Sequence, residues 1–560
     1  MRPRTVCLLL LFALASTLAY AQLPQFRHIV IIVQENRTPD NLFGSGPSLS
    51  HCGTEDPFEA GVDIVGGGYG TPPGGSRQEI CSFPVAMNAG FDPDHFYDDI
   101  NNNGYGWLHQ YDSGNMDGFC EIYTNGQCLQ YSYVQRPDVQ PYFDIATNYG
   151  FANYMFQTNE GPSFPAHQML FSGTSAPTNP NDPSGYGVDF VAENPINQNG
   201  GNHDGGCADD PAQRNIDDEP SWVFPTGVEF TATQMMNLHL PFGLECYPHD
   251  SLVTAVNGTG ITNKATWHYY TPTDGSIWTA PAAIPEACYG QNSGYPLGNA
   301  CRNYTEYSSH VIIPGTMSGQ GAPIFGDIAD CNLPQITWVI PDQAWSDHPG
   351  QPTGPAMGPS WVGDIIDAVG GSPCTDTVNG SQVSYWDDTA IFVVWDDWGG
   401  FYDHVSPATT TGIGVYRSTE QGTCPISIAP NGWGCGNVYG FRVPLLVVSA
   451  YTNPGYVSGM CTGTCPNSVF PYVHDFGSIL AFTEYNFGMG SIDNTGDKGY
   501  ADRNAPDNSL TNIPLQEFFS VANKRTFTYI NTPYPSSTFT NYYQQHPNYQ
   551  PTGPDGGPDD

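Results

Sequence analysis

The chain has 560 residues, of which 55 are Asp or Glu and only 15 are Lys or Arg, and its formal net charge at pH 7 is −40. Lysine occurs only at Lys264, Lys498 and Lys524, so the charge reflects missing bases more than added acids. Such a surface repels phosphate backbones and anionic membranes, which argues against nucleic-acid binding as a main function. An anionic substrate then needs a local positive centre, and a bound metal ion is the simplest candidate.

The first 21 residues have the three parts of a secretory signal peptide. Arg2 and Arg4 precede an apolar run over Val6–Leu18, and an Ala-Tyr-Ala segment ends at residue 21. The run is too short to span a membrane, and no later stretch reaches the roughly 20 apolar residues that a spanning helix needs. The sequence therefore predicts export, to a secreted or periplasmic location, with the mature chain beginning near Gln22.

The cysteines agree with an oxidising compartment. Fifteen are present, and an even number remains once Cys7 leaves with the signal peptide. Close spacing predicts local disulfides for three pairs, namely Cys120/Cys128, Cys424/Cys435 and Cys461/Cys465. A zinc site at Cys461 and Cys465 is the alternative, but no second ligand pair follows at a suitable spacing.

Short apolar runs between turn residues predict strands that are buried on both faces. They are His28–Val33, Ala265–Tyr270, Ile336–Ile340, Ala390–Trp395 and Pro444–Ser449. Helical spacing predicts helices over Trp361–Val369 and Asp475–Phe487, the second capped by Asp475. Strands that alternate with helices predict an α/β fold, with a central, mostly parallel sheet flanked by helices.

No repeat or linker divides the chain, so we expect a single domain over residues 22–548 with long, disulfide-bearing loops. Residues 177–220 are rich in Asn, Asp, Gly and Pro, which predicts a loop insertion. Residues 549–560 have the composition of a disordered tail.

Polar residues follow three of the predicted strands: Glu35-Asn36, Asp342 and Asp396-Asp397. Ligands of open parallel sheets bind beyond the carboxyl ends of the strands, where these residues would gather. The first and third groups offer three carboxylates and an amide oxygen, donors that suit Ca, Mg or Mn and can also accept Zn. Carboxylates that simply cap strand-to-loop turns remain the alternative.

A Gly161-Pro162 turn places Ser163 at the start of a predicted helix. Backbone N–H groups and the helix dipole can receive an anion there, and a metal ion would activate the hydroxyl as a nucleophile. An ordinary serine N-cap is the alternative.

Three histidines each follow an aspartate: His95, His348 and His404. Each has the chemistry to contact a phosphoryl oxygen or to protonate a leaving group. Each is equally compatible with a structural histidine held by its aspartate.

Collinear segments of this chain resemble motifs of the bacterial phosphoesterase family that contains non-haemolytic phospholipases C and respiratory-burst-inhibiting acid phosphatases. They run in the family's order and cover most of the chain beyond the signal peptide: Ile29–Gly44, Asn115–Phe119, Pro141–Ala146, Gly161–Gly173, Ser346–Pro349, Asp388–Val405, Gly440–Pro444 and Asp475–Glu484.

The resemblance implies an alkaline-phosphatase-like fold and metal-assisted phosphoester hydrolysis. It implies that Ser163 is the nucleophile, beside a divalent metal of unidentified type, and that a serine phosphoenzyme forms. His95 and His348 would contact the phosphoryl oxygens. The resemblance also implies that five residues bind the metal: Ser163, Glu35, Asn36, Asp396 and Asp397.

The sequence also departs from the family pattern. Asp397-Trp398 stands where Glu-His is frequent, and Ala166-His167 stands where Asn-Arg often follows the nucleophile. The late Glu-His-Thr-Ser motif is replaced by a segment that begins at His474. Trp398, His167 and His404 consequently receive no predicted role.

The sequence thus predicts a secreted phosphoester hydrolase that acts on a small phosphoester or a phospholipid. A serine at position 163, rather than the threonine common in phospholipase-type members, favours the acid-phosphatase type, with phospholipase C as the alternative. A secreted binding protein that retains the fold without turnover is a rival from another class. A serine esterase has less support, because no Gly-x-Ser-x-Gly elbow is present.

Overall fold

The computed structural model describes residues 23–44, 61–89, 106–158, 163–175, 207, 250–253, 265–290, 301–314, 322–350, 354–407, 439–460, 472–492, 500–509, 512–549 and 551. The predicted signal peptide and His95 lie outside these residues, as do the Cys424/Cys435 and Cys461/Cys465 pairs. So does the predicted 177–220 insertion, apart from Cys207.

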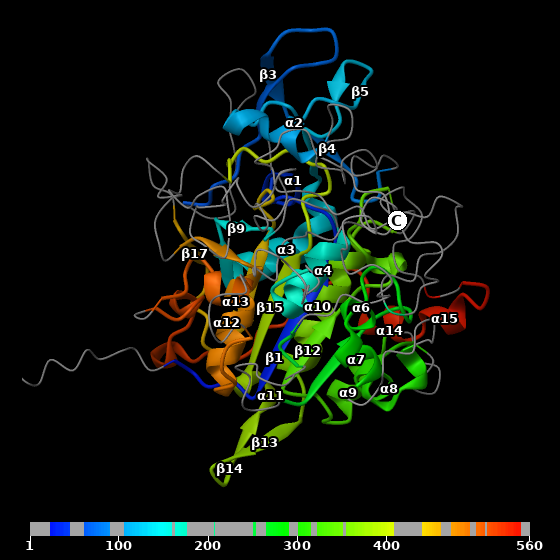
Figure 1. The fold of residues 1–560 in the computed structure, drawn as a ribbon, viewed down its shortest axis with the longest axis vertical. Helices are drawn as coiled ribbons and strands as arrows, with labels where there is room; N and C mark the ends of the chain where they lie inside the picture. The colour runs from blue at the N-terminus through cyan, green and yellow to red at the C-terminus, as the bar shows by residue number, and fades with distance from the viewer. Residues whose placement is uncertain are drawn as a thin grey trace, which may run out of the picture.

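An eight-stranded sheet forms the centre of the structure, in the order β11-β10-β12-β1-β15-β16-β8-β17 (Figure 1). Strand β16 runs antiparallel to β15 and β8, and the other neighbouring strands pair in parallel. All five predicted strands are present, and the prediction of a mostly parallel sheet is confirmed. In sheet order the strands are Val311–Ile312, Trp267–Tyr270, Ile336–Val339, His28–Gln34, Thr389–Trp395, Leu445–Ser449, Gly150–Ala152 and Tyr456–Ser458.

Strands β1 and β15 lie side by side at the middle of this sheet, and every residue of both is buried. Their continuous apolar sequences, rich in β-branched residues, suit strands covered on both faces. The parallel register pairs Gln34 with Trp395, the last residue of each strand. Because both strands end at the same level, the residues that follow them emerge together.

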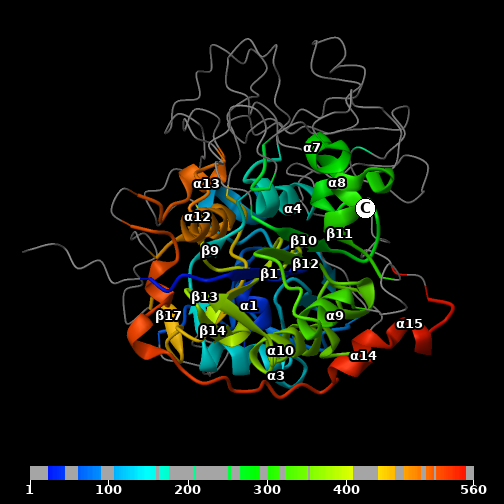
Figure 2. The same ribbon diagram turned by 90° about the horizontal axis from the view of Figure 1, so that it is seen from below.

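Helices cover both faces of the sheet (Figure 2). On one face lie α4 (Ser163–Ser172) and α12 (Phe476–Phe487), and on the other lie α3 (Arg136–Asn148) and α10 (Met357–Gly370). Phe392 of β15 contacts Phe482 of α12, and Trp338 of β12 contacts Phe171 of α4. Phe392 and Trp338 both pair with Ile31 of β1, so their side chains point to the same face of the sheet, the one that α4 and α12 cover.

Both predicted helices are present. Helix α10 extends beyond the predicted span at each end. Helix α12 begins after Asp475, whose side chain accepts a hydrogen bond from the backbone N–H of Ser478. The Ser478 hydroxyl accepts one in return from the Asp475 N–H, which completes a capping box, and it donates to Asp507 Oδ1 at 2.7 Å. The helix ends at Gly488, which has a φ of 58° that favours glycine.

Smaller elements surround this core. The paired short strands are β2 (Gly67–Gly70) with β3 (Gln78–Cys81), β4 (Phe83–Val85) with β7 (Ser132–Val134), β5 (Tyr123–Thr124) with β6 (Gln127–Cys128), β9 (Met155–Phe156) with β18 (His474–Asp475), and β13 (Thr375–Val378) with β14 (Ser381–Ser384). The short helices are α1 (Pro39–Leu42), α2 (Trp107–Tyr111), α6 (Ala280–Ala283), α7 (Pro285–Tyr289), α8 (Thr305–His310), α9 (Pro323–Ala329), α11 (Tyr385–Asp388), α13 (Ala501–Asn504), α14 (Ser536–Thr540) and α15 (Tyr542–Gln545).

Disulfides close loops around the sheet, as predicted. The Cys120–Cys128 pair is confirmed, and two further disulfides join Cys288 to Cys301 and Cys331 to Cys374. Within the described residues, no helix has the length and apolar character needed to cross a membrane.

Candidate active site

The loops that follow β1 and β15 are hydrogen-bonded to each other, although 360 residues separate Asn36 from Asp396. The backbone N–H of Asn36 donates to Asp396 Oδ1 at 3.1 Å, and the Arg37 N–H donates to the Asp397 carbonyl at 2.9 Å. The structure thus brings together the four predicted metal ligands, all of them buried: Glu35, Asn36, Asp396 and Asp397.

A tight backbone contact holds these loops at close range. Asn36 has a φ of 54° and Gly399 a φ of 61°, both in the left-handed region. A Cβ atom on Gly399 would lie 2.2 Å from the Asn36 carbonyl oxygen, so only glycine fits there. The Gly399 N–H donates to Asp397 Oδ1 at 2.7 Å, which directs the other carboxylate oxygen of Asp397 away from the loop.

That second oxygen meets the predicted nucleophile. Ser163 is the first residue of α4, and its Oγ donates a hydrogen bond to Asp397 Oδ2 at 2.9 Å. The hydroxyl is therefore held at a helix N-terminus and beside the acidic cluster, which is the geometry required of a nucleophile that attacks an anionic group.

His167 joins the cluster from the next turn of the same helix. Its Nε2 lies 3.3 Å from Glu35 Oε1 and 3.5 Å from Asp396 Oδ2. The indole of Trp278 stacks on the imidazole, with ring centroids 5.9 Å apart and an interplanar angle of 16°. Sequence reasoning left this residue without a role, although Ser163 and His167 are four residues apart and so share one helix face.

The donor atoms fit a metal ion. One atom each from Glu35, His167 and Asp396 lie within 4.8 Å of one another, and all three side chains are buried. Among the described residues, neither ring nitrogen of His167 nor Asp396 Oδ2 makes a hydrogen bond. A buried polar atom without a partner costs about 1–3 kcal/mol, so such atoms facing one another indicate a place for a cation.

The charges lead to the same conclusion. Burial acts to raise the pKa of Asp396, but the approach of His167, together with Glu35 and Ser163, outweighs burial and holds that pKa below its usual value. Asp396 is therefore ionised beside two other buried carboxylates, Glu35 and Asp397. Buried like charges repel strongly unless a cation compensates them.

His348 also packs against Trp278, with the Trp278 and His348 ring centroids 6.4 Å apart. Its Nδ1 donates a hydrogen bond to the carbonyl oxygen of Pro349 at 2.8 Å, which fixes the orientation of the ring. The structure thus places one of the two predicted phosphoryl-contacting histidines near the cluster, and His95 lies outside the described residues.

Asp347 anchors the loop that carries His348 to the opposite face of the sheet. Its carboxylate accepts hydrogen bonds from the Tyr142 hydroxyl at 2.6 Å and from Trp395 Nε1 at 3.1 Å. Burial raises the pKa of Asp347 to about 7. Sequence reasoning also missed this residue, since its contacts come from strands and helices distant in the chain.

His404 belongs to a different, buried ionic network. Its Nδ1 lies 2.7 Å from Asp40 Oδ2 and its Nε2 lies 3.1 Å from Asp63 Oδ1. The Arg442 guanidinium is buried and pairs with Asp403 at 2.6 Å. Asp40, Asp403 and His404 also have donor atoms within 4.8 Å of one another. Arg442 and His404 already supply positive charge to these aspartates, so the network does not need a metal ion to balance its carboxylates.

This network predicts a pH-dependent stability. Burial acts to lower the pKa of His404, but the neighbouring carboxylates raise it to about 10 from a usual 6.5. Its contribution to the free energy of unfolding is thus fully present below pH 6.5 and is lost as the pH rises through 10. With about 1.4 kcal/mol for each pKa unit, the contribution is at most roughly 5 kcal/mol.

We expect His404→Gln to remove part of the fall in stability between pH 6.5 and 10, as measured by urea denaturation across this range. His546→Gln, at the exposed residue that follows α15, is the matched control and should leave the pH profile unchanged. Identical profiles for the parent and His404→Gln would show that His404 is not the titrating group.

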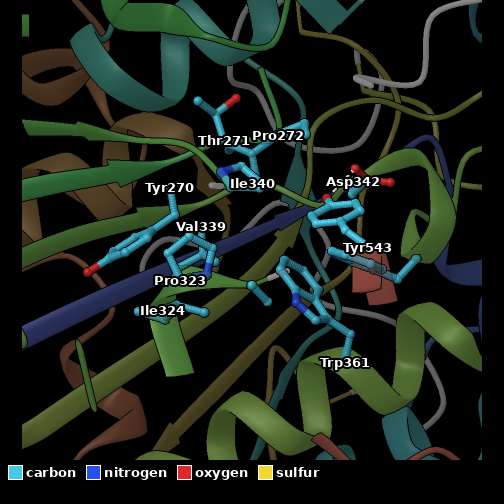
Figure 3. A pocket seen from close by; sticks show the side chains of 13 residues that line it. Tyr270, Thr271, Pro272, Pro323, Ile324, Val339, Ile340, Asp342, Trp361 and Tyr543 are labelled. Atoms are coloured by element: carbon cyan, nitrogen blue, oxygen red, sulfur yellow. Dashed lines mark hydrogen bonds between the residues drawn. The ribbon is translucent and has the colours of Figure 1, made fainter. Parts of the chain in front are cut away.

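The structure also contains a pocket at the carboxyl ends of β10 and β12 (Figure 3). Tyr270, Val339 and Trp361 line it, on the face covered by α9 and α10. The Asp342 carboxylate accepts hydrogen bonds from the hydroxyls of Tyr543 and Tyr549, at 2.6 and 2.5 Å. Asp342, one of the polar residues predicted to follow a strand, therefore lines this pocket, on the opposite face of the sheet from the Ser163 cluster.

Comparisons with known proteins agree with the predicted relationship. A profile of the phosphoesterase family matches residues 26–490. Non-hemolytic phospholipase C of Burkholderia pseudomallei is 23% identical over 480 residues, which cover 82% of this chain and 55% of that protein. Phospholipase C B of Mycobacterium tuberculosis is 34% identical over 131 residues, 22% of each chain. Hemolytic phospholipase C of Pseudomonas aeruginosa is 28% identical over 166 residues, 29% of this chain and 19% of that protein.

The alignments thus span about half or less of the length of these relatives. The family profile, by contrast, extends from the start of β1 to the end of α12 and includes every described residue of the Ser163 cluster. On this evidence the chain belongs to the phosphoesterase family.

Proposed function

We propose that the protein is a metal-assisted phosphoester hydrolase in which Ser163 is the nucleophile. The observation that carries the proposal is the hydrogen bond from Ser163 Oγ to Asp397, at a helix N-terminus beside the buried Glu35, His167 and Asp396 cluster. Membership of the phosphoesterase family supports it.

Glu35, Asn36, Asp396 and Asp397 would hold a divalent cation, with His167 as an added nitrogen donor. When bound, the cation would supply the positive charge that draws a phosphate group into this acidic protein and makes the serine hydroxyl a better nucleophile. The imidazole nitrogen shifts the preference of the site from Ca and Mg towards Zn, Mn or Fe.

The residues of the chain then divide the remaining work. Asp397 Oδ2 orients Ser163 Oγ and is placed to accept its proton as the bond from Oγ to phosphorus forms and the bond to the leaving group breaks. The N–H groups at the start of α4 would face the phosphoryl oxygens. His348 and, from the family resemblance, His95 would contact the same oxygens. Water then releases phosphate and restores the serine.

His167 gives the first test of this ligand set. We expect His167→Ala to lower metal affinity at least about tenfold, because the site loses its nitrogen donor. Metal content after dialysis, measured by elemental analysis, checks this expectation. The matched control is His348→Ala, at the other histidine that packs against Trp278, which should lower turnover and leave metal content unchanged. Equal metal content in His167→Ala and the parent would remove His167 from the ligand set.

The substrate class is tested with chromogenic phosphate monoesters, phosphate diesters and phosphatidylcholine, each with and without chelator. Chelator-sensitive hydrolysis of monoesters supports the acid-phosphatase type, which Ser163 favours. Preferential hydrolysis of phosphatidylcholine supports phospholipase C, the activity named for the relatives. Metal binding without turnover on any substrate would support the non-catalytic alternative.

We also propose that the fold is of the alkaline-phosphatase-like type, that residues 22–548 form one domain, and that the protein is exported. The disulfides support export, because they form and persist in oxidising compartments.

A further inference from the structure

A second group of potential metal-ligating side chains lies where β1 and β15 begin, at the opposite end of these strands from Ser163. His28 is the first residue of β1, and Asp388 immediately precedes β15, whose first residue pairs with His28. Asp376 reaches them from the β13–β14 hairpin, which extends beyond this end of the strands (Figure 1). One donor atom from each of the three lie within 4.8 Å of one another.

Asp388 is the observation that points to a ligand. Its side chain is 2% exposed, and neither carboxylate oxygen has a hydrogen-bond partner among the described residues. Burial raises the pKa of this carboxyl group to about 7. An isolated buried carboxylate is one of the more costly features of a protein interior, and it is normally paired or bound to a metal.

His28 is oriented as a metal ligand would be. Its Nδ1 donates to the Pro334 carbonyl at 2.7 Å, which leaves Nε2 facing the two carboxylates. The Nε2 atom lies 2.7 Å from Asp376 Oδ2, and the Tyr385 ring packs against the imidazole with centroids 4.7 Å apart. A backbone carbonyl that holds the other ring nitrogen is the usual second-shell arrangement of metal-binding histidines.

The nearby positive charge does not balance the carboxylates. Arg27 Nε is 3.7 Å from Asp376 Oδ1, but the Arg27 side chain is 47% exposed. Exposed ion pairs of this kind contribute little to stability. The Asp376 side chain is 22% exposed, so an ion has a route from solvent to the buried Asp388.

We propose that His28, Asp376 and Asp388 bind a second, structural divalent cation of the Zn²⁺ or Mn²⁺ class. One imidazole and two carboxylates suit these ions better than Mg²⁺ or Ca²⁺, and solvent completes the coordination. The ion joins the start of β1, the β13–β14 hairpin and the start of β15, so its removal weakens the fold. The site stands apart from the Ser163 cluster and does not depend on the proposed function.

The test uses the full mature chain with Asp396→Asn, which weakens the first site. After chelation and dialysis, we expect calorimetry to detect about one equivalent of bound Zn²⁺, with a rise in Tm. Adding Asp388→Asn should abolish both. The control is Asp387→Asn, because Asp387 pairs with Lys524 at the surface, at 2.9 Å, and its loss should change neither.

Three results would overturn the proposal. The first two are no Zn²⁺ or Mn²⁺ binding by the Asp396→Asn protein, and equal binding after Asp388→Asn. A higher Tm for Asp388→Asn in Zn²⁺ would do the same, because it is the result expected of an uncompensated buried carboxylate. If Asp388→Asn does not fold, Asp376→Asn replaces it, since this side chain is on the hairpin and partly exposed, and the same loss of Zn²⁺ is required.

Discussion

Replacement of Ser163 by alanine is expected to reduce turnover by several orders of magnitude, approaching the roughly 10⁶-fold loss that follows removal of a nucleophile in other covalent hydrolases. The Ser163 hydroxyl is held by Asp397 Oδ2 at 2.9 Å and has a helix N-terminus behind it. Alanine removes the atom that would bond to phosphorus. Among the described residues it removes the hydrogen bond to Asp397, worth about 1 kcal/mol.

The matched control for this variant is Ser172→Ala. Ser172 is buried at the other end of α4, and its hydroxyl makes no hydrogen bond within the described part of the chain. It should retain parental activity on the best chromogenic ester, and both variants should keep the parental circular dichroism. Activity of Ser163→Ala within about tenfold of the parent would exclude Ser163 as the nucleophile.

Asp396→Asn is expected to lower metal content and turnover together. Asp396 Oδ1 accepts hydrogen bonds from the backbone N–H groups of Asn36 and Asp397, at 3.1 and 2.8 Å. An asparagine can retain this acceptor, so the loops should keep their arrangement. The change removes a negative charge from a cluster that contains Glu35 and Asp397, and with it one donor to the cation.

In the metal-free protein, the same variant is expected to increase thermal stability. Without a cation the buried carboxylates repel one another, so loss of one charge should raise Tm in the presence of chelator. Elemental analysis, turnover and Tm are compared with those of Asp330→Asn, an isosteric change at an exposed residue. A parent that is fully active without metal, or a variant that keeps both metal and turnover, would contradict the proposed site.

Local pattern was enough to predict several parts of this protein. The apolar runs of β1 and β15 identified buried strands, and Asp475 marked the start of α12. The approach of Glu35 to Asp396 followed from one further rule, that neighbouring parallel strands end at the same edge of a sheet. These features depend on periodicity, capping and strand direction, and each of these signals is found within a few neighbouring residues of the sequence.

Other features were decided by tertiary packing. His167 faces Glu35 and Asp396 only because α4 packs on that face of the sheet, and no local signal sets which face a helix covers. His404 lies in an ion network because Asp63 and Arg442, distant in sequence, meet it there. Asp342, a strand end like the other two, instead meets the hydroxyls of Tyr543 and Tyr549. The sequence by itself determined which residues follow the strands, and the packing of helices and loops decided which of them meet, because those contacts join segments hundreds of residues apart.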